Sequence, residues 1–303
     1  MDFSNRIPAA MLWATICLSL TLVSLHAGAN VRQAGPKTAR DAPKTLRDPS
    51  LKSTSVLVVD PTDSSVLLSK NADVASPIAS ITKLMTALVV LEAGQSLDEP
   101  IEVTAADQNF GKGSSSRLSV GTMLSRGDMM HLALMASENR AAHALGSNYP
   151  GGIPAIVEAM NAKAASLGMS SAHFVEPTGL SSENIASPED LAKLVVAASR
   201  NPTIRSFSTD PRYAVRVHRH IVEFRNTDKL VSNPTWNIIV QKTGYITEAG
   251  RCLVMEAVIE GRSVVIVLLD SFGKYTRLAD ATRVKNWLKT IGLGARLTQV
   301  SMR

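Results

Sequence analysis

Apolar and polar positions follow a strand-like period near both ends of the chain. Near the start, residues 56–60 and 66–68 are apolar runs separated by the turn-forming segment 61–64, which predicts a β-hairpin. Three more strand-like runs lie towards the end, at 238–240, 252–259 and 264–269, with a hairpin turn at 260–262. One sheet assembled from both ends of the sequence is therefore expected.

The segment between these strands carries helical signals. Residues 77–91 are mostly apolar, which predicts a buried central helix that ends at Gly94. Capping residues at Ser125 and Ser187 predict that further helices begin directly after them. Two more helices are predicted at 153–167 and 275–288. Fewer than twenty residues remain after the closing helix, so no second domain is expected there.

The first 52 residues differ from the rest. Residues 7–25 are apolar, follow Arg6 and precede the small residues Ala27 and Ala29, so residues 1–29 are predicted to be an export signal cleaved after Ala29. An uncleaved membrane anchor is the alternative, because a run of this length can also span a bilayer. Residues 30–52 contain three prolines, alternating charges and no aromatic residue, which predicts a flexible linker.

The net charge of +6 resides mainly in this linker. Residues 30–52 contain six basic residues and two aspartates, which contribute 6 − 2 = +4. The chain has no basic helix with interleaved aromatic residues and no zinc-finger spacing, so nucleic-acid binding is not expected. Cys252 is the only thiol outside the predicted signal, which excludes an internal disulfide in the mature chain. The histidines show no metal-binding spacing, and no cofactor is expected.

Three short motifs carry candidate chemistry, and they occur in the order Ser80-x-x-Lys83, Ser137-x-Asn139 and Lys242-Thr243-Gly244. On a helix, Ser80 and Lys83 share one face, one turn apart, so the lysine could take the proton of the serine if its pKa is lowered. Free N–H groups at the helix start could stabilise an oxyanion. Because Ser-x-x-Lys recurs at Ser271, the ordered set of motifs carries the argument.

The set resembles the signature of the serine penicillin-binding proteins and β-lactamases. Over residues 53–290 the chain looks closest to the low-molecular-mass D-alanyl-D-alanine peptidases, and especially to the murein D,D-endopeptidase branch. The matching runs are 79–87, 132–141, 174–180 and 241–245. The resemblance implies an α/β (α+β) fold with a central antiparallel sheet flanked by helices and a helical subdomain. Residues 291–303 would then be a short C-terminal tail.

The resemblance also implies roles for the motif residues. Ser80 would be acylated by the penultimate D-alanine carbonyl, and Lys83 would accept its proton. Ser137 would relay a proton to the leaving amine, and Asn139 would hold the substrate amide and Lys83. Binding roles fall to a second set of residues, Lys242, Thr243, Gly244, Tyr245 and Arg225.

Within the second set, Lys242 and Thr243 would bind the anionic end of the substrate. Gly244 would let the substrate backbone lie close to the strand. The N–H groups of Tyr245 and Ser80 would form the oxyanion hole. Arg225 is a looser match to an arginine near the substrate carboxylate.

The expected function is therefore a periplasmic serine D,D-endopeptidase that cleaves peptidoglycan cross-links and is inhibited by β-lactams. A carboxypeptidase that trims terminal D-alanine is the first alternative, and a non-catalytic domain that binds murein or β-lactams is the second. The loop at residues 176–180 resembles the peptidase sequence pattern and not the Glu-x-x-x-Asn loop of β-lactamases. Because β-lactamases need a carboxylate to activate the deacylating water, slow deacylation is expected here. The expected partners are peptide stems and β-lactams, and the basic linker leaves peripheral membrane association open.

Overall fold

The computed structural model of the 303-residue chain describes residues 49–108, 116–291 and 300–301. The predicted export signal and nearly all of the predicted linker lie outside these residues. Within the described part, no helix combines the length and the apolar character needed to cross a bilayer.

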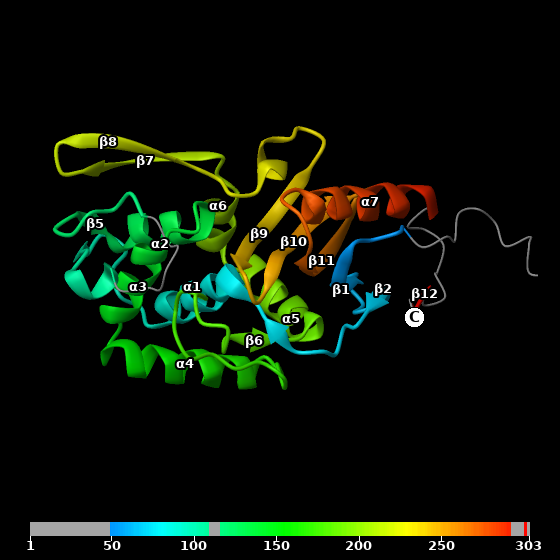
Figure 1. The fold of residues 1–303 in the computed structure, drawn as a ribbon, viewed down its shortest axis with the longest axis horizontal. Coiled ribbons are helices and arrows are strands. Elements are labelled where there is room, and N and C mark those ends of the chain that lie inside the picture. Colours follow the sequence, from blue (N-terminus) through cyan, green and yellow to red (C-terminus); the bar gives the residue numbers. More distant parts are fainter. Residues whose placement is uncertain (1–48, 109–115, 292–299, 302–303) are drawn as a thin grey trace, which may run out of the picture. The chain divides into compact units, whose positions relative to one another are not determined.

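A six-stranded sheet forms the centre of the described fold, in the order β12-β2-β1-β11-β10-β9 (Figure 1). The strands are β1 (Ser53–Val59), β2 (Val66–Lys70), β9 (Asn237–Ile246), β10 (Gly250–Ile259), β11 (Arg262–Ser271) and β12 (Val300–Ser301). All neighbouring pairs are antiparallel except β12 with β2. Because β1 pairs with β11, the two ends of the sequence share one sheet, which confirms the prediction.

Helices cover both faces of this sheet, and the strand sequences reflect this. Residues 264–269 of β11 are all buried, as expected of a strand covered on both sides. In β1, Leu57 packs into the larger core, which includes α1 and α5, whereas Val56 and Val58 pack into the core under α7. Figure 1 shows α5 and α7 on opposite sides of the strands.

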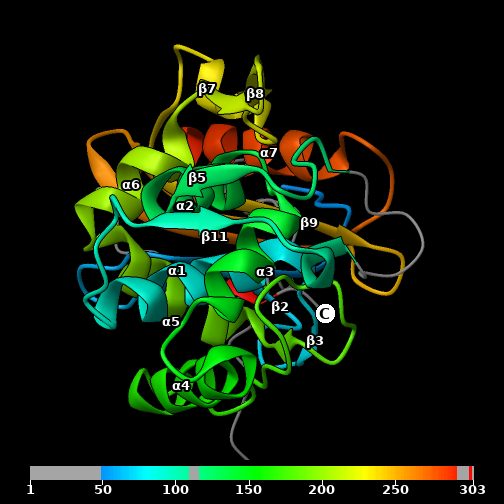
Figure 2. The ribbon, with the colours of Figure 1, turned by 90° about the vertical axis from the view of Figure 1, so that its left-hand side faces the viewer.

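The helices are α1 (Thr82–Glu92), α2 (Arg126–Met135), α3 (Asn139–Ser147), α4 (Gly152–Ser166), α5 (Pro188–Ser199), α6 (Pro202–Thr209) and α7 (Thr276–Ile291). Residues 82–90 of α1 are all buried, so α1 is the predicted central helix. The predicted caps also form, because Ser125 and Ser187 each complete a capping box. In Figure 2, α1, α2 and α3 stand in front of the sheet as the helical part of the fold.

Several elements escaped the sequence analysis. They are α3, α6, β12 and the small strand pairs β3 (Ser76–Pro77) with β6 (Ile185–Ala186), β4 (Pro100–Glu102) with β5 (Met123–Ser125), and β7 (Arg212–Val217) with β8 (His220–Arg225). Strands of two or three residues are too short to show a period. The β7–β8 hairpin alternates correctly, but its outward positions are rich in arginine, which obscured an element whose inner face is apolar.

Candidate active site

The candidate nucleophile and its candidate base lie where the central helix begins. Ser80 occupies a 3₁₀ turn (Ala79–Ile81) directly before α1, and Lys83 lies in the first turn of α1. Lys83 Nζ donates a hydrogen bond of 2.8 Å to Ser80 Oγ. Both side chains are buried, with Ser80 8% and Lys83 1% exposed. The spacing of the first motif therefore produces the contact that was predicted from it.

Lys83 has three hydrogen-bond acceptors. Besides Ser80 Oγ, its ammonium donates to Asn139 Oδ1 at 2.8 Å and to the carbonyl of Thr178 at 2.5 Å. Burial lowers the pKa of Lys83 to about 8, against the opposing charges of Glu176 and Glu138. With that pKa, a sizeable minority of molecules have a neutral lysine at neutral pH, which a general base requires.

A second buried lysine lies on the neighbouring strand. Lys242, on β9, donates to Ser137 Oγ at 2.9 Å and to the Thr243 carbonyl at 2.8 Å. Burial lowers the pKa of Lys242 well below its usual value, and the charges of Lys83 and Arg277 lower it further. Repulsion by Lys83 therefore contributes to the lowered pKa of Lys242. For Lys83 the cause is burial.

Two residues beside the cleft have strained backbones. Ala79, directly before Ser80, has φ of 47°, and Ser137 has φ of 59°. Residues other than glycine rarely adopt these left-handed conformations, and they persist only where the surrounding structure imposes them. Here the strain aims Ser80 and Ser137 at the same space from two different elements.

Gly244 allows β9 to lie directly against the turn that carries Ser80. A Cβ atom at this position would lie 2.9 Å from the Ile78 carbonyl oxygen and 3.2 Å from the backbone nitrogen of Ser80. The sequence analysis expected the missing side chain to make room for the substrate backbone. The structure shows that the closest neighbour is the chain's own backbone.

These elements enclose a cleft of about 210 Å³ that all three motifs line. Its lining residues are Ser80, Ser137, Asn139, Leu180, Thr227, Thr243, Gly244, Tyr245 and Arg277. Lys83 and Lys242 lie beneath this wall, where they bond to the two serines. The structure therefore brings together every predicted site residue except one.

Arg225 lies outside the cleft. It belongs to β8, its side chain is 72% exposed, and its Nε lies 3.3 Å from Glu223. Strand alternation is the reason, because it turns the neighbouring Phe224 inward and Arg225 outward.

The arginine in the cleft is Arg277, which the sequence analysis missed. It lies in the first turn of α7 and is 8% exposed. Within the described part of the chain, its buried Nε and Nη1 have no hydrogen-bond partner. A single arginine at a helix start forms no motif, so no sequence signal pointed to it. Thr227, whose Oγ1 lies 2.6 Å from that of Thr243, was missed for the same reason.

Glu176 organises the segment that supplies the third acceptor of Lys83. Its carboxylate accepts hydrogen bonds from Thr178 N at 2.6 Å, Thr178 Oγ1 at 2.5 Å, Gly179 N at 2.6 Å and Asn184 Nδ2 at 2.9 Å. These bonds fix the backbone on both sides of the Thr178 carbonyl. The carboxylate is therefore fully engaged in holding this loop.

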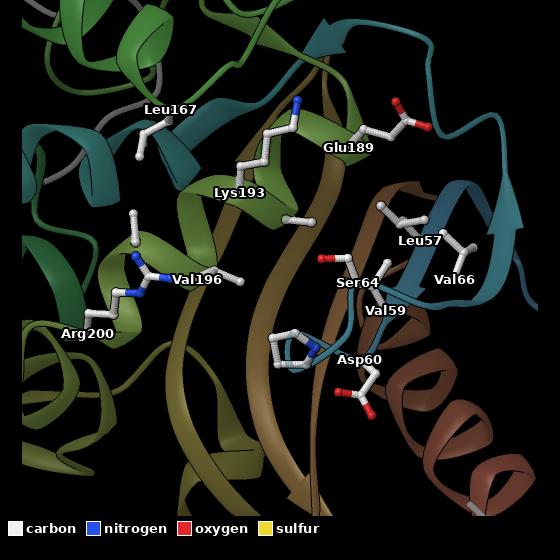
Figure 3. A pocket seen from close by; sticks show the side chains of 13 residues that line it. Leu57, Val59, Asp60, Ser64, Val66, Leu167, Glu189, Lys193, Val196 and Arg200 are labelled. Atoms are coloured by element: carbon white, nitrogen blue, oxygen red, sulfur yellow. The ribbon is translucent and has the colours of Figure 1, made fainter. Parts of the chain in front are cut away.

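A larger cavity of about 450 Å³ lies elsewhere, between α5 and the β1–β2 hairpin (Figure 3). Apolar side chains such as Val59, Val66 and Val196 line it, and Glu189 and Lys193 lie at its edge. None of the three motifs reaches it. In the described residues, no group of three or more His, Cys, Asp or Glu side chains is placed to hold a metal ion.

Comparison with known proteins identifies the family. A family model described as D-alanyl-D-alanine carboxypeptidase matches residues 42–273. This chain belongs to that family. A D-alanyl-D-alanine endopeptidase from Pseudomonas aeruginosa is 46% identical over 273 residues, which cover 89% of this chain and 88% of that protein. One from Escherichia coli is 46% identical over 260 residues, covering 85% and 83%.

Solved structures of the family share the fold. The Streptomyces K15 DD-transpeptidase aligns with a TM-score of 0.75 at 27% identity, covering 80% of this chain and 98% of that one. A D-alanyl-D-alanine carboxypeptidase from Mycobacterium tuberculosis aligns with a TM-score of 0.76 at 26% identity, covering 85% and 98%. The predicted family and fold class are both confirmed.

Proposed function

We propose that this protein is a serine D,D-endopeptidase that cleaves D-alanyl cross-links of peptidoglycan through an acyl-enzyme on Ser80. The observation that carries the proposal is the 2.8 Å bond between Ser80 Oγ and a buried lysine of lowered pKa. The two relatives at 46% identity, both named endopeptidases, support cross-links as the substrate. The predicted export signal supports a periplasmic location, where peptidoglycan is accessible.

Acylation begins with proton transfer from Ser80 to neutral Lys83. Ser80 Oγ then attacks the carbonyl carbon of the D-alanine, and the carbonyl oxygen gains a negative charge. The backbone N–H groups of Ser80 and Tyr245 stabilise that charge. When the C–N bond breaks, the leaving amine takes a proton, which Ser137 relays from the lysine pair. The ester on Ser80 is the acyl-enzyme.

Deacylation reverses these roles, with water in place of the amine. Lys83 takes a proton from the water, whose oxygen attacks the ester, and Ser80 recovers its proton as the C–O bond breaks. Glu176 has no free lone pair for a water, because five donors already occupy its carboxylate. Glu176 is thus not free to act as the carboxylate base of a β-lactamase, and a penicilloyl group should persist on Ser80.

Arg277 supplies the binding site for the substrate carboxylate. In a D,D-peptide bond, the residue on the leaving side carries a free carboxylate next to the amine. Arg277 lines the cleft, two nitrogens of its buried guanidinium have no partner among the described residues, and Thr243 contributes a hydroxyl to the same cleft. A terminal D-alanine presents the same carboxylate, so trimming by a carboxypeptidase is the second candidate, which the description of the family favours.

The test is intact mass spectrometry of residues 30–303 after incubation with benzylpenicillin, followed by incubation with purified cross-linked muropeptide dimers. We expect one covalent adduct, its loss in Ser80→Ala, and its retention in Ser271→Ala, the serine of the other Ser-x-x-Lys sequence. Conversion of dimers to monomers identifies an endopeptidase, whereas loss of terminal D-alanine alone identifies a carboxypeptidase. If neither an adduct nor turnover is observed, the proposed enzymatic function is refuted, and a non-catalytic domain that binds murein or β-lactams remains as the alternative.

A further inference from the structure

The β7–β8 hairpin presents a strongly basic outer face. Its outward positions carry four arginines, Arg212, Arg216, Arg219 and Arg225, which we call the arginine face. Glu223 is the only carboxylate within residues 212–225, so the hairpin has a net charge of 4 − 1 = +3 with its histidines neutral. Figure 1 shows the hairpin extending away from the sheet strands.

The charges on this face oppose folding. Arg212 and Arg225 are directly paired across the two strands, and like charges in that position destabilise a hairpin. Glu223 relieves part of the repulsion, at 3.6 Å from Arg212 and 3.3 Å from Arg225. The remaining arginines have no such counter-charge in the hairpin. An anionic ligand would supply the missing negative charge.

The inner face of the hairpin holds this arrangement in place. Tyr213 donates a hydrogen bond of 2.5 Å to Asp128 on α2. The side chains of Val215 on β7 and Phe224 on β8 are buried. Arg117 stacks on the ring of Phe224 at 3.9 Å, and its Nη1 donates to the Glu223 carbonyl at 2.6 Å. These contacts therefore fix the position of the hairpin that bears the arginine face.

The arginine face begins beside the catalytic cleft. Thr227, two residues after Arg225, lines the cleft and contacts Thr243. Asn226, between them, donates to the carbonyls of Ser208 and Asp210, which fixes the base of the hairpin. Six-residue strands extend about 20 Å from this base. A ligand that leaves the cleft on this side can therefore continue along the arginines.

We propose that the arginine face is an exosite for the free carboxylates of a peptidoglycan peptide stem whose cross-link occupies the cleft. The proposal rests on the proposed function. Guanidinium groups bind carboxylates through paired hydrogen bonds, and all four cations here are arginines. Each exposed pair adds only a small factor in affinity, so several carboxylates on one polymer must act together.

A membrane surface is the other anionic partner to consider. A hairpin that enters a bilayer would present several large apolar side chains beside its cations. On the outer positions of this hairpin, Ile221 is the only one, with 63% exposure. The position beside the cleft and the arginine composition both favour the peptide stem.

The test compares the full mature chain with the variant Arg212→Gln/Arg216→Gln/Arg219→Gln. The matched control is Arg200→Gln/Arg205→Gln/Lys52→Gln, which removes three exposed charges that lie outside the hairpin strands and turn. Endopeptidase turnover is measured on isolated sacculi at low and high salt, and benzylpenicillin acylation is measured on the same samples. Binding to vesicles of phosphatidylglycerol is measured in parallel.

For the hairpin variant we expect KM for sacculi to rise about tenfold at low salt, with kcat and the acylation rate within about twofold of wild type. High salt should remove the difference. The exosite proposal would be overturned by an unchanged KM for sacculi or by an equal rise in KM in the control variant. It would also be overturned if the hairpin variant lost only its binding to vesicles. Failure of the wild-type protein to acylate would instead refute the proposed function, so the two failures are distinguishable.

Discussion

A lysine with three hydrogen-bond acceptors is usually a stabilised cation, whereas the general-base role proposed for Lys83 requires it to lose a proton. Burial favours the neutral amine by lowering the pKa of Lys83 to about 8, while the charges of Glu176 and Glu138 keep that pKa from falling further. The result is a lysine that can hold or release a proton at neutral pH. Asn139 and Thr178 fix its position in either state.

Removing this amine should abolish most acylation. We expect Lys83→Ala to slow benzylpenicillin acylation by about a hundredfold or more, because general-base catalysis is worth that much. The second-order acylation rate measures the effect. Lys274→Ala, at the other Ser-x-x-Lys sequence, is the control and should leave the rate unchanged. Near-normal acylation of Lys83→Ala would refute the assigned role.

Glu176 offers a way to shift the same pKa without touching the lysine. Its negative charge raises the pKa of Lys83, so Glu176→Gln should lower that pKa and leave the lysine neutral at more acidic pH. The acid limb of the pH–acylation profile should therefore move to lower pH. Glu183→Gln, an exposed carboxylate nearby in the chain, is the control. A limb that stays in place, or moves to higher pH, would contradict this electrostatic role.

At the scale of elements, the site is a contact between a turn and a strand. The 3₁₀ turn Ala79–Ile81 places Ser80, and β9 brings Lys242 to Gly244 alongside it. Periodicity predicted α1, β10, β11 and the two capped helices because each has a long apolar face or a capping pair. It could not show Arg277 or Thr227, because their importance comes from which elements pack together.

The contact between turn and strand leaves no room for a side chain at position 244. Gly244→Ala should push β9 away from the Ser80 backbone, since its Cβ would lie 2.9 Å from the Ile78 carbonyl oxygen. We expect a large loss of acylation together with a lower Tm. Gly127→Ala, whose Cβ would lie no closer than 3.3 Å to its neighbours, should leave acylation near wild type. Wild-type acylation by Gly244→Ala would show that the strand position is not critical.

For the molecule as a whole, Asp228 makes stability depend on pH. Burial raises its pKa to about 6, so the folded state favours the protonated carboxyl. This contribution is fully present below pH 4 and is lost as the pH rises through about 6. Asp228 Oδ1 accepts the Leu230 N–H at 2.9 Å, a bond that an asparagine could keep.

Asp228→Asn should therefore raise the free energy of unfolding at pH 7, by about 2 kcal/mol, and change it little at pH 4. Denaturant unfolding at the two pH values provides the measurement. Asp98→Asn, an exposed aspartate, is the control. A variant that is less stable than wild type at pH 7 would indicate that the charge of Asp228 is needed, through its attraction to Arg277.

The pairing of β1 with β11 has a consequence for how the enzyme matures. Ser80 belongs to the first third of the chain, but β9, the strand that lies against its turn, is synthesised much later. Until β9, β10 and β11 have paired, nothing holds Ser80 beside Lys242. A growing or truncated chain should therefore be unreactive towards penicillin, and only a chain that has completed the sheet can attack a peptide bond. Covalent labelling with penicillin thus reports a finished fold.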